Sequence, residues 1–566
     1  MNCYAGKITV WLAFVGCLQM HCPEQANAKA SEQSVDFLNA DKKDIQQWRQ
    51  MKFGLFIHWG PISLKGAPIS WSRGGERPGW HGSGHIPVDI YDNLYKQFNP
   101  VKFNADEWVQ MAKDAGMKYL VFGCKHHDGF CMFDSKLTNY KITNSPFKRD
   151  VVKELADACH KAGLKFGIYY SLPDWYHPDY RTKNHYCYIK FLHAQIREIC
   201  SNYGKIDIIW WDGLGGSAKD WDSENLFRMI RRLQPHVIIN NRGGLPGDHQ
   251  TVEQRIGEHQ FDHPWETNMT LCTRWAWVPN DKMKSLRQCI HTLVRVVGGD
   301  GNFLFNVGPM SDGRIKPRQV ARLKEMGDWL DNYGRSIYAT RGGPFIPGSW
   351  GASTRRGNTI YLHILNWAED TIVLPPIPNS IIGSAVMTGG AAHLKQTDEA
   401  IEISVPKAHR RELDTIIVLE LDGPASEIGP LSLPFSSLTA GKKARASNTH
   451  QNPAPPHNDP DRAVDDDMFT RWATDTGTTQ AWLEVDLGKA TTFNRTRISE
   501  EYDRVQEFEL QYKDGSQWKT FARGTKIGPN YSSQFESVTA RYVRLNILKA
   551  TDGPTIWEFQ LFAPKM

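Results

Sequence analysis

Between Lys52 and Pro309 the chain alternates short apolar runs with amphipathic segments, and this alternation limits the fold more than any other feature. The apolar runs cover residues 52–58, 118–123, 164–170, 206–211, 237–241 and 302–307. Buried strands that alternate with helices indicate a parallel sheet with helices on its faces. The spacing leaves room for about seven or eight such units, which predicts a (β/α)8-type barrel. An open doubly wound sheet is the alternative, but no strand is followed by the glycine-rich phosphate turn of that fold.

The helical segments carry end signals. Asn104 and Glu107 form a capping box at the start of one helix, and Gly116 follows its last turn. Asp150 begins another helix, and we expect three more over residues 189–200, 224–233 and 283–297. Residues 251–273 break the alternation, so we expect the barrel to be irregular there.

After Gly343 the pattern changes to short runs between turn residues. We expect strands over residues 359–365, 371–374, 401–405 and 414–421, which indicate a β-sandwich. A Pro- and Ser-rich stretch follows and then a second all-β module. The predicted fold is therefore multidomain, α/β followed by all-β. Its expected parts are a barrel over 31–340, a β-sandwich over 341–423, a linker over 424–437 and a β module over 438–566.

The N-terminus is typical of an export signal. Lys7 supplies a positive charge, the apolar run Ile8–Met20 follows it, and Ala28 and Ala30 offer cleavage sites. Because the run is too short to span a bilayer, we expect residues 1–30 to be a cleaved signal peptide and no membrane span. The expected destination is the periplasm or the medium.

Composition excludes several classes of protein. A formal net charge of +5 on 566 residues gives no reason to expect nucleic acid or an anionic membrane as a partner. The seven cysteines after the signal are scattered and lack metal-ligand spacing, so no disulfide framework is predicted. The 20 Trp favour a sugar ligand, because indole faces stack on the apolar faces of pyranose rings.

Catalytic groups of such barrels lie at the C-terminal ends of the strands. Those ends carry His58-Trp59, His126-His127-Asp128, Tyr169-Tyr170, Trp210-Trp211-Asp212, Asn240-Asn241-Arg242 and Asn306-Val307. Asp212 directly follows an apolar run, so its carboxylate should lie at the rim beside aromatic walls, positioned to attack an anomeric carbon. A helix cap or a buried ion pair is the alternative role for such an aspartate.

Retaining hydrolysis of a glycoside needs a second carboxyl about 5–5.5 Å from the nucleophile. Glu253, Glu258 and Glu266 are the candidates, and their spacing does not decide among them. His126 and His127 are adjacent on a strand and point to opposite faces, so they do not easily ligate one metal ion. We expect hydrogen bonds from these histidines to sugar hydroxyls, and no metal or other cofactor in catalysis.

Several motifs occur together in one order: residues 53–60 (Phe-Gly-Leu-Phe-Ile-His-Trp-Gly), 98–100, 125–130, 150–152, 211–213 and 306–309. In this combination the chain resembles glycoside hydrolase family 29, the α-L-fucosidases, over residues 36–423. The resemblance implies a retaining exo-α-L-fucosidase. Such an enzyme removes terminal α-L-fucose from a fucosylated oligosaccharide or glycoconjugate by double displacement.

The resemblance also implies residue roles. Asp212 matches the nucleophile, and Glu253 lies where the main branch of the family places its acid/base. Glu266 is the second choice, because this residue is the least uniform feature of the family. The substrate-binding residues would be His58, Trp59, His126, His127, Tyr170, Trp210 and Arg242.

One segment departs from the family pattern. Many members carry Glu-Trp-Tyr after the first strand, whereas this chain has residues 71–80, Trp-Ser-Arg-Gly-Gly-Glu-Arg-Pro-Gly-Trp. We expect this loop to border the entrance on the side of the leaving group, so the linkage preference depends on it.

The last module has motifs at residues 463–467, 471–473, 483–488 and 540–545. It resembles the discoidin fold, the coagulation factor 5/8 type C domain, which is common among carbohydrate-binding modules. Such modules often hold a structural Ca²⁺, and the carboxylates of Asp465 and Asp467 are suitable hard ligands.

Two other functions fit the same residues. One is a retaining α-glycosidase of the same family that acts on another α-linked sugar. The other is a catalytically inactive glycan-binding protein, although the presence of Asp212 together with the whole rim argues against it. The sequence carries no signal for the linkage or the oligomeric state.

Overall fold

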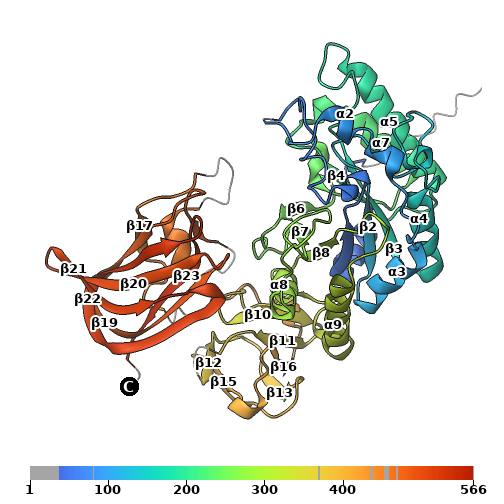
Figure 1. Ribbon diagram of the computed structural model, residues 1–566. Helices are drawn as coiled ribbons and strands as arrows, with labels where there is room; N and C mark the ends of the chain where they lie inside the picture. The colour runs from blue at the N-terminus through green and yellow to red at the C-terminus, as the bar shows by residue number, and fades with distance from the viewer. Residues whose placement is uncertain are drawn as a thin grey trace, which may run out of the picture. The chain divides into compact units, whose positions relative to one another are not determined.

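A computed structural model describes residues 37–564 except 81, 368–369, 434–436, 452–457 and 467–469 (Figure 1). The predicted signal peptide lies outside the described residues.

The first part of the described chain is a parallel sheet of eight strands. The strands are β1 (Phe53–Ile57), β2 (Tyr119–Lys125), β3 (Lys165–Ser171), β4 (Ile208–Asp212), β5 (Ile238–Ile239), β6 (Gln250–Glu253), β7 (Trp265–Thr270) and β8 (Asn302–Val307). Their order is β5-β4-β3-β2-β1-β8-β7-β6, so β5 and β6 are the two edges. One isolated parallel bridge, Asn240 to His249, links the segments beside those edges. The predicted barrel is therefore confirmed as a curled sheet with one weakly joined seam.

Helices connect most of these strands (Figure 1). They are α1 (Lys42–Met51), α2 (Val88–Tyr91), α3 (Ala105–Asp114), α4 (Val151–Ala162), α5 (His185–Asn202), α6 (Ala218–Trp221), α7 (Ser223–Leu233), α8 (Leu286–Gly298) and α9 (Pro317–Tyr333). Asn104 caps α3 by accepting from the backbone N–H of Glu107, 3.3 Å away. Its side-chain amide donates to the Glu107 carboxylate, so the return bond differs from that of a standard capping box.

The irregular stretch expected after residue 251 is explained by the connections of β6. Described residues 254–264, between β6 and β7, contain no helix. The seam of the barrel and the missing helix thus occur in the same region.

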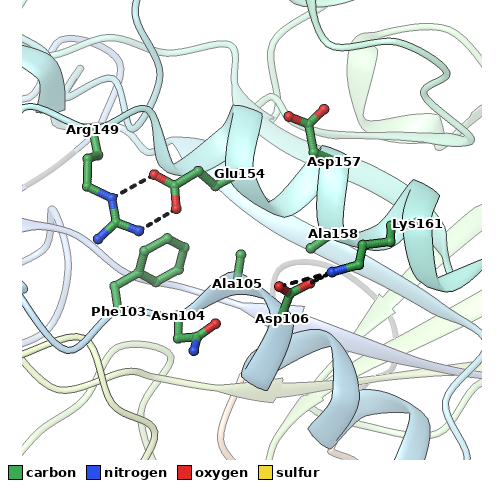
Figure 2. Close-up of a pocket in the computed structure, with 9 residues that line it drawn as sticks. All are labelled: Phe103, Asn104, Ala105, Asp106, Arg149, Glu154, Asp157, Ala158 and Lys161. Carbon is green, nitrogen blue, oxygen red and sulfur yellow. Dashed lines mark hydrogen bonds and ion pairs between the residues drawn. The ribbon is translucent and has the colours of Figure 1, made fainter.

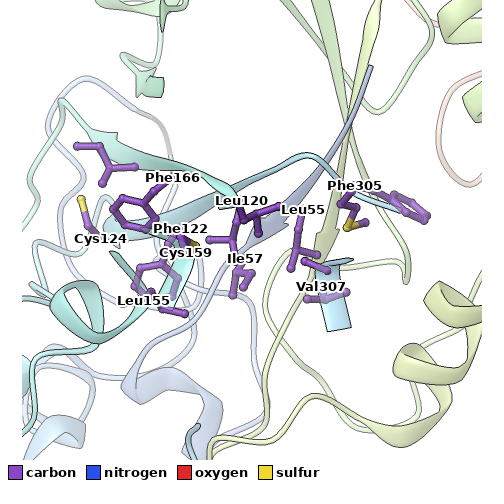
Figure 3. Packing of buried hydrophobic residues seen from close by; sticks show 14 of the residues in the cluster. Leu55, Ile57, Leu120, Phe122, Cys124, Leu155, Cys159, Phe166, Phe305 and Val307 are labelled. Carbon is purple, nitrogen blue, oxygen red and sulfur yellow. The ribbon is translucent and has the colours of Figure 1, made fainter. Parts of the chain in front are cut away.

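Alternate residues of the strands pack on opposite sides of the sheet, as the period of two requires. Leu55, Ile57, Leu120 and Phe122 pack with residues of α4 in the main core, which Figure 3 shows in part. The other side holds a separate buried cluster that includes Phe56, Tyr119, Val121, Tyr169, Trp210 and Leu304. This cluster fills the barrel interior, so a side chain two residues after Phe56 or Trp210 points to the interior side of the rim.

Two antiparallel sheets follow. One has the order β13-β16-β11-β10-β9 and the other β12-β15-β14. The strands are β9 (Arg341–Gly342), β10 (Gly351–Arg356), β11 (Thr359–Ile364), β12 (Thr371–Leu374), β13 (Ile381–Val386), β14 (His393–Gln396), β15 (Ile401–Ser404) and β16 (Thr415–Leu421). Apolar side chains from both sheets form one core, which gives the predicted β-sandwich.

The C-terminal module is a separate antiparallel β unit with its own core. Its strands are β17 (Lys443–Ala446), β18 (Trp472–Ala473), β19 (Ala481–Glu500), β20 (Val505–Asp514), β21 (Gln517–Gly524), β22 (Tyr531–Ala550) and β23 (Thr555–Phe562). Trp472 is fully buried in this core. Across the part of the chain that the structure describes, no helix is both long and apolar enough for a membrane span.

Candidate active site

A pocket opens at the C-terminal ends of the barrel strands. It is small, with a cavity volume of about 80 Å³. Its lining residues are Phe56, His58, Trp71, His126, His127, Tyr169, Trp210, Asp212, Leu214, Arg242, Glu253, Asn268 and Trp275. Seven of the predicted site residues therefore meet in one place: His58, His126, His127, Trp210, Asp212, Arg242 and Glu253.

Asp212 is the last residue of β4, and the side chains of Tyr169 and Arg242 hold its carboxylate, with His127 beside it. The Tyr169 hydroxyl donates to Oδ2 at 2.9 Å, and His127 Nε2 lies 3.5 Å from the same oxygen. Arg242 Nη1 lies 3.6 Å from Oδ1. The side chain is still 14% exposed toward the pocket. A carboxylate that is held in place and reachable is suited to nucleophilic attack.

Arg242 joins Asp212 to the second carboxylate. The same Nη1 atom donates to Glu253 Oε2 at 2.9 Å. The nearest oxygens of Asp212 and Glu253 therefore lie no farther apart than the sum of the two Nη1 distances. That limit is compatible with the separation of about 5–5.5 Å between the carboxyl groups of retaining glycosidases.

The surroundings fix the charge and position of Arg242. Burial lowers the pKa of its guanidinium, but the carboxylates of Asp212 and Glu253 outweigh burial and leave the pKa raised. The guanidinium also lies over the Trp210 ring, 4.8 Å from its centroid, and Nε donates to the Thr251 hydroxyl at 2.8 Å. Arg242 is therefore a permanent cation between the two acids.

The three histidines of the pocket are neutral near pH 7. Burial lowers the pKa of His58 to about 4 and the pKa values of His126 and His127 well below their usual value. A neutral imidazole has one donor and one acceptor nitrogen, and its partner decides which is which.

The partners define the tautomers of two of these histidines. The Asn306 amide donates to the Trp275 carbonyl, so its Oδ1 accepts from His58 Nδ1 at 2.7 Å. The Ser171 hydroxyl donates to the Pro173 carbonyl, so it accepts from His127 Nδ1 at 2.6 Å. The Nε2 atoms of both histidines are thus acceptors, which suits the O–H groups of a sugar.

The prediction that Tyr170 binds the substrate is wrong, because Tyr169 and not Tyr170 lines the pocket. Tyr170 points away from the pocket, where its hydroxyl donates to Gln195 Oε1 of α5 at 2.6 Å. Successive strand residues face opposite sides, and Tyr169 is the register partner of Trp210. Matching the parity of β3 to that of β4 would have identified Tyr169 from the sequence.

Trp59 is a second misplaced residue, for the same reason. It follows His58 directly, so it faces the opposite side of the strand and is only 2% exposed. Its ring packs against Phe98, Phe103 and Trp108, and its Nε1 donates to the Met310 carbonyl. Trp59 is a core residue beneath the rim.

The second choice for the acid/base, Glu266, does not reach the pocket. It lies near the N-terminal end of β7, is 1% exposed, and accepts hydrogen bonds from Tyr119 and Trp210 at 2.6 and 3.0 Å. Glu258, in the loop after β6, is exposed and does not line the pocket. Among the three carboxyls considered, Glu253 is the one that shares the pocket with Asp212.

Besides Tyr169, five pocket-lining residues were not among the predicted site residues: Phe56, Trp71, Leu214, Asn268 and Trp275, although the loop that carries Trp71 was expected to border the entrance. Phe56 has the parity of His58 and was recognisable on that basis. Trp71 and Trp275 lie on loops, whose course no periodicity predicts.

A larger hollow, about 500 Å³, lies between α3 and α4 (Figure 2). Its charged groups pair with one another or with neighbours: Arg149 with Glu154, Lys161 with Asp106, and Asp157 with Lys153. The hollow lacks the converging acids and histidines of the rim, so the rim pocket is the candidate active site.

Only part of the calcium site predicted near Asp465 and Asp467 falls within the described residues. Asp467 lies outside the described residues. Asp465 accepts from the Thr470 hydroxyl at 2.8 Å and lies 3.4 Å from Arg462 Nη1, so its oxygens already have partners. No group of three or more His, Cys, Asp or Glu in the described part of the chain is arranged to hold a metal ion. The calcium stays a prediction.

Comparisons with known proteins agree with this geometry. Residues 18–335 match the family model of α-L-fucosidase, and residues 462–545 match that of a NedA-like, galactose-binding domain. The chain is 30% identical to the tissue α-L-fucosidase of Bos taurus over 385 residues, which are 61% of this chain and 80% of that protein.

Solved structures extend the similarity. An α-L-fucosidase isoenzyme 1 from Paenibacillus thiaminolyticus is 34% identical, with a TM-score of 0.62, and the match covers 67% of this chain and 99% of that one. A glycoside hydrolase family 29 α-L-fucosidase from Bacteroides thetaiotaomicron, solved as a trapped covalent intermediate, is 27% identical with a TM-score of 0.61. That match covers 68% of this chain and 97% of the other.

Proposed function

The chain belongs to the α-L-fucosidase family of retaining glycoside hydrolases, and we propose that Asp212 and Glu253 carry out its reaction. It is an exo-acting hydrolase that removes terminal α-L-fucose from a glycan by double displacement. In the proposal Asp212 is the nucleophile, and Glu253 acts first as general acid and then as general base. The observation that carries the proposal is the single Arg242 nitrogen within 3.6 Å of one acid and 2.9 Å of the other.

In the first step an Asp212 oxygen attacks C1 of the bound fucose while Glu253 gives a proton to the departing glycosidic oxygen. A covalent ester of fucose on Asp212 results, and the leaving sugar departs as an alcohol. In the second step Glu253 takes a proton from water, the water oxygen attacks C1, and the ester bond breaks. Two inversions at C1 give net retention.

The other pocket residues bind and orient the sugar. The acceptor Nε2 atoms of His58 and His127 suit fucose hydroxyl donors, and Tyr169 holds the Asp212 carboxylate through its hydroxyl. Trp210 supports both Arg242 and Tyr169. The Arg242 guanidinium lies over the Trp210 ring, and the Tyr169 ring stacks on it. Apolar walls such as Phe56 and Trp275 fit the C6 methyl group that distinguishes fucose from fully hydroxylated hexoses.

We further propose that the protein is exported, because Lys7 and the run Ile8–Met20 make a signal peptide with cleavage near Ala28 or Ala30. The periplasm and the medium are both compatible destinations. A calcium ion near Asp465 and Asp467 would be structural and would take no part in the reaction.

Release of 4-nitrophenol from its α-L-fucoside by the purified protein tests the proposal. We expect turnover by the wild type and loss of turnover in Asp212→Ala. The corresponding α-galactoside and α-glucoside, which lack the C6 methyl, should be poor substrates. Equal rates on all three glycosides would contradict the assignment of the sugar.

A further inference from the structure

A row of aromatic rings runs from the pocket to the protein surface. The Trp71 ring lies 5.5 Å from the His127 ring, and the Trp80 ring lies 5.3 Å from the Trp71 ring. Trp71 lines the pocket, whereas Trp80 does not and is 48% exposed. An indole offers a large apolar face with a polar edge, and here it is exposed beside a candidate sugar site.

The loop that carries these rings is firmly held. Arg73 makes a two-pronged ion pair with Asp92, at 2.7 Å for each contact. Backbone bonds between Gly74 and Ile86 and between Gly84 and Arg73 close the loop into a hairpin-like turn. These bonds fix the base of the loop before any ligand arrives, which reduces the entropy cost of binding.

Arg77 fixes the orientation of the first ring. Its guanidinium lies beside the contacting rings of Trp71 and Trp175, 5.5 and 5.3 Å from their centroids, and donates to the Trp71 and Arg73 carbonyls. Trp80 follows in a turn in which its N–H donates to the Arg77 carbonyl at 2.8 Å. The buried cation thus anchors the inner ring and, through this turn, the outer one.

A cationic side chain lies next to the residue that precedes the exposed ring. Gly79 has a φ of +84°, and a Cβ there would come within 2.6 Å of Arg181 Nε. The glycine therefore lets the Arg181 guanidinium pack against the residue before Trp80. An apolar ring with polar donors at its side is the usual way in which a protein binds a pyranose.

The pocket is small, with a cavity volume of about 80 Å³, so the part of a glycan substrate beyond the terminal fucose must lie outside it. We propose that Trp80, backed by Trp71, is a subsite that stacks on the pyranose ring to which the fucose is linked. This inference rests on the proposed function and adds the class of leaving group: a sugar with an apolar C–H face. It assigns the subsite to the loop of residues 71–80, which departs from the family pattern.

The test compares two kinds of substrate, one of which has no leaving-group ring. α-L-Fucosyl fluoride occupies the pocket alone, whereas α-L-fucosyl disaccharides also present a pyranose outside it. The disaccharide that the wild type hydrolyses fastest, from a set covering each linkage, is used for kcat/KM. Trp80→Ala should lower kcat/KM on this disaccharide by roughly 5- to 10-fold and on the fluoride by less than about 2-fold.

Two variants serve as controls. Trp80→Phe keeps an aromatic face and should retain most of the activity on the disaccharide. Tyr502→Ala removes a similarly exposed aromatic side chain, 50% exposed, from the C-terminal module and should change neither rate.

The subsite would be ruled out if Trp80→Ala lowered both rates equally or neither, or if Trp80→Phe were as defective as Trp80→Ala. Failure of the wild type to hydrolyse the fluoride would instead remove the proposed function, so the two failures are distinguishable.

Discussion

The rim of the barrel and the layer beneath it each hold a carboxylate, yet the two acids lie in opposite settings. At the rim, Glu253 is 40% exposed and pairs with the Arg242 cation. Near the N-terminal ends of the strands, Glu266 is sealed from water and accepts hydrogen bonds from the neutral groups of Tyr119 and Trp210. His249 Nε2 lies 3.8 Å from Glu266, and burial lowers the pKa of this histidine to about 3.

This difference shows that an acid with a shifted pKa need not be the general acid of the reaction. Burial raises the pKa of Glu266 to about 7, the value commonly expected of a general acid. Perturbed pKa values do gather at active sites, but burial alone produces them as well. Glu266 lacks access to the pocket, and a general acid must reach the glycosidic oxygen. Position therefore favours Glu253.

Trp210 connects the two layers. Its Nε1 donates downward to Glu266, while its ring lies against Arg242 and stacks on Tyr169 at 5.6 Å. The sealed layer thus supports the groups that orient Asp212. We expect Glu266 to act on catalysis only through the position of Trp210.

The largest effect should come from Asp212→Asn. The amide is nearly the same shape and still accepts from the Tyr169 hydroxyl, but it is a far weaker nucleophile. Turnover of 4-nitrophenyl α-L-fucoside should fall by more than about 10⁴-fold, with an unchanged melting temperature as the check on folding. A loss of only about tenfold would move the nucleophile elsewhere.

Glu253→Gln and Glu266→Gln should separate the two acids by their dependence on the leaving group. On a fucosyl disaccharide, Glu253→Gln should lower kcat/KM by about 10²- to 10⁴-fold, because the departing oxygen needs a proton. On α-L-fucosyl fluoride, which needs little protonation, the loss should be below about tenfold.

The matched variant Glu266→Gln should lower both rates by the same small factor. If its loss depended on the leaving group while that of Glu253→Gln did not, the two roles would be exchanged.

Much of this arrangement was accessible from the sequence because strand ends and their polar residues follow from periodicity. The β8 bounds, Asn302–Val307, match the predicted strand, and His58, Asp212 and Arg242 follow strands that were recognised. The errors at Trp59 and Tyr170 are errors of parity: a strand end was located, but the face of each residue was not. Glu266 was undecided because β6 and β7 are joined without a helix, which left their register open.

The difference between the neighbours Tyr169 and Tyr170, which face opposite sides of the strand, gives a third test with a smaller effect. Tyr169→Phe removes a hydrogen bond to the Asp212 carboxylate and should lower kcat/KM by roughly 10- to 100-fold. Its neighbour is the control: Tyr170→Phe loses the bond to Gln195 and should lower the free energy of unfolding by about 1 kcal/mol while leaving kcat/KM within about twofold. Equal kinetic losses in the two variants would mean that both tyrosines serve the site.

The smallest effect concerns stability and pH. Because the pKa of Glu266 is raised from 4.5 to about 7 on folding, the native state binds a proton more tightly than the unfolded state between these values. The contribution of Glu266 to stability is therefore fully present below about pH 4.5 and decreases as pH rises through 7, by about 3 kcal/mol in total.

Glu266→Gln has no such proton. The melting temperature of the wild type should therefore fall relative to that of this variant as pH rises from 5 to 8, so that the two pH dependences converge or cross. A difference in melting temperature that stays constant over this range would show that Glu266 keeps one charge state throughout. Glu266 and Glu253 would then differ only in their access to the pocket, because the proton affinity of Glu266 would no longer distinguish it.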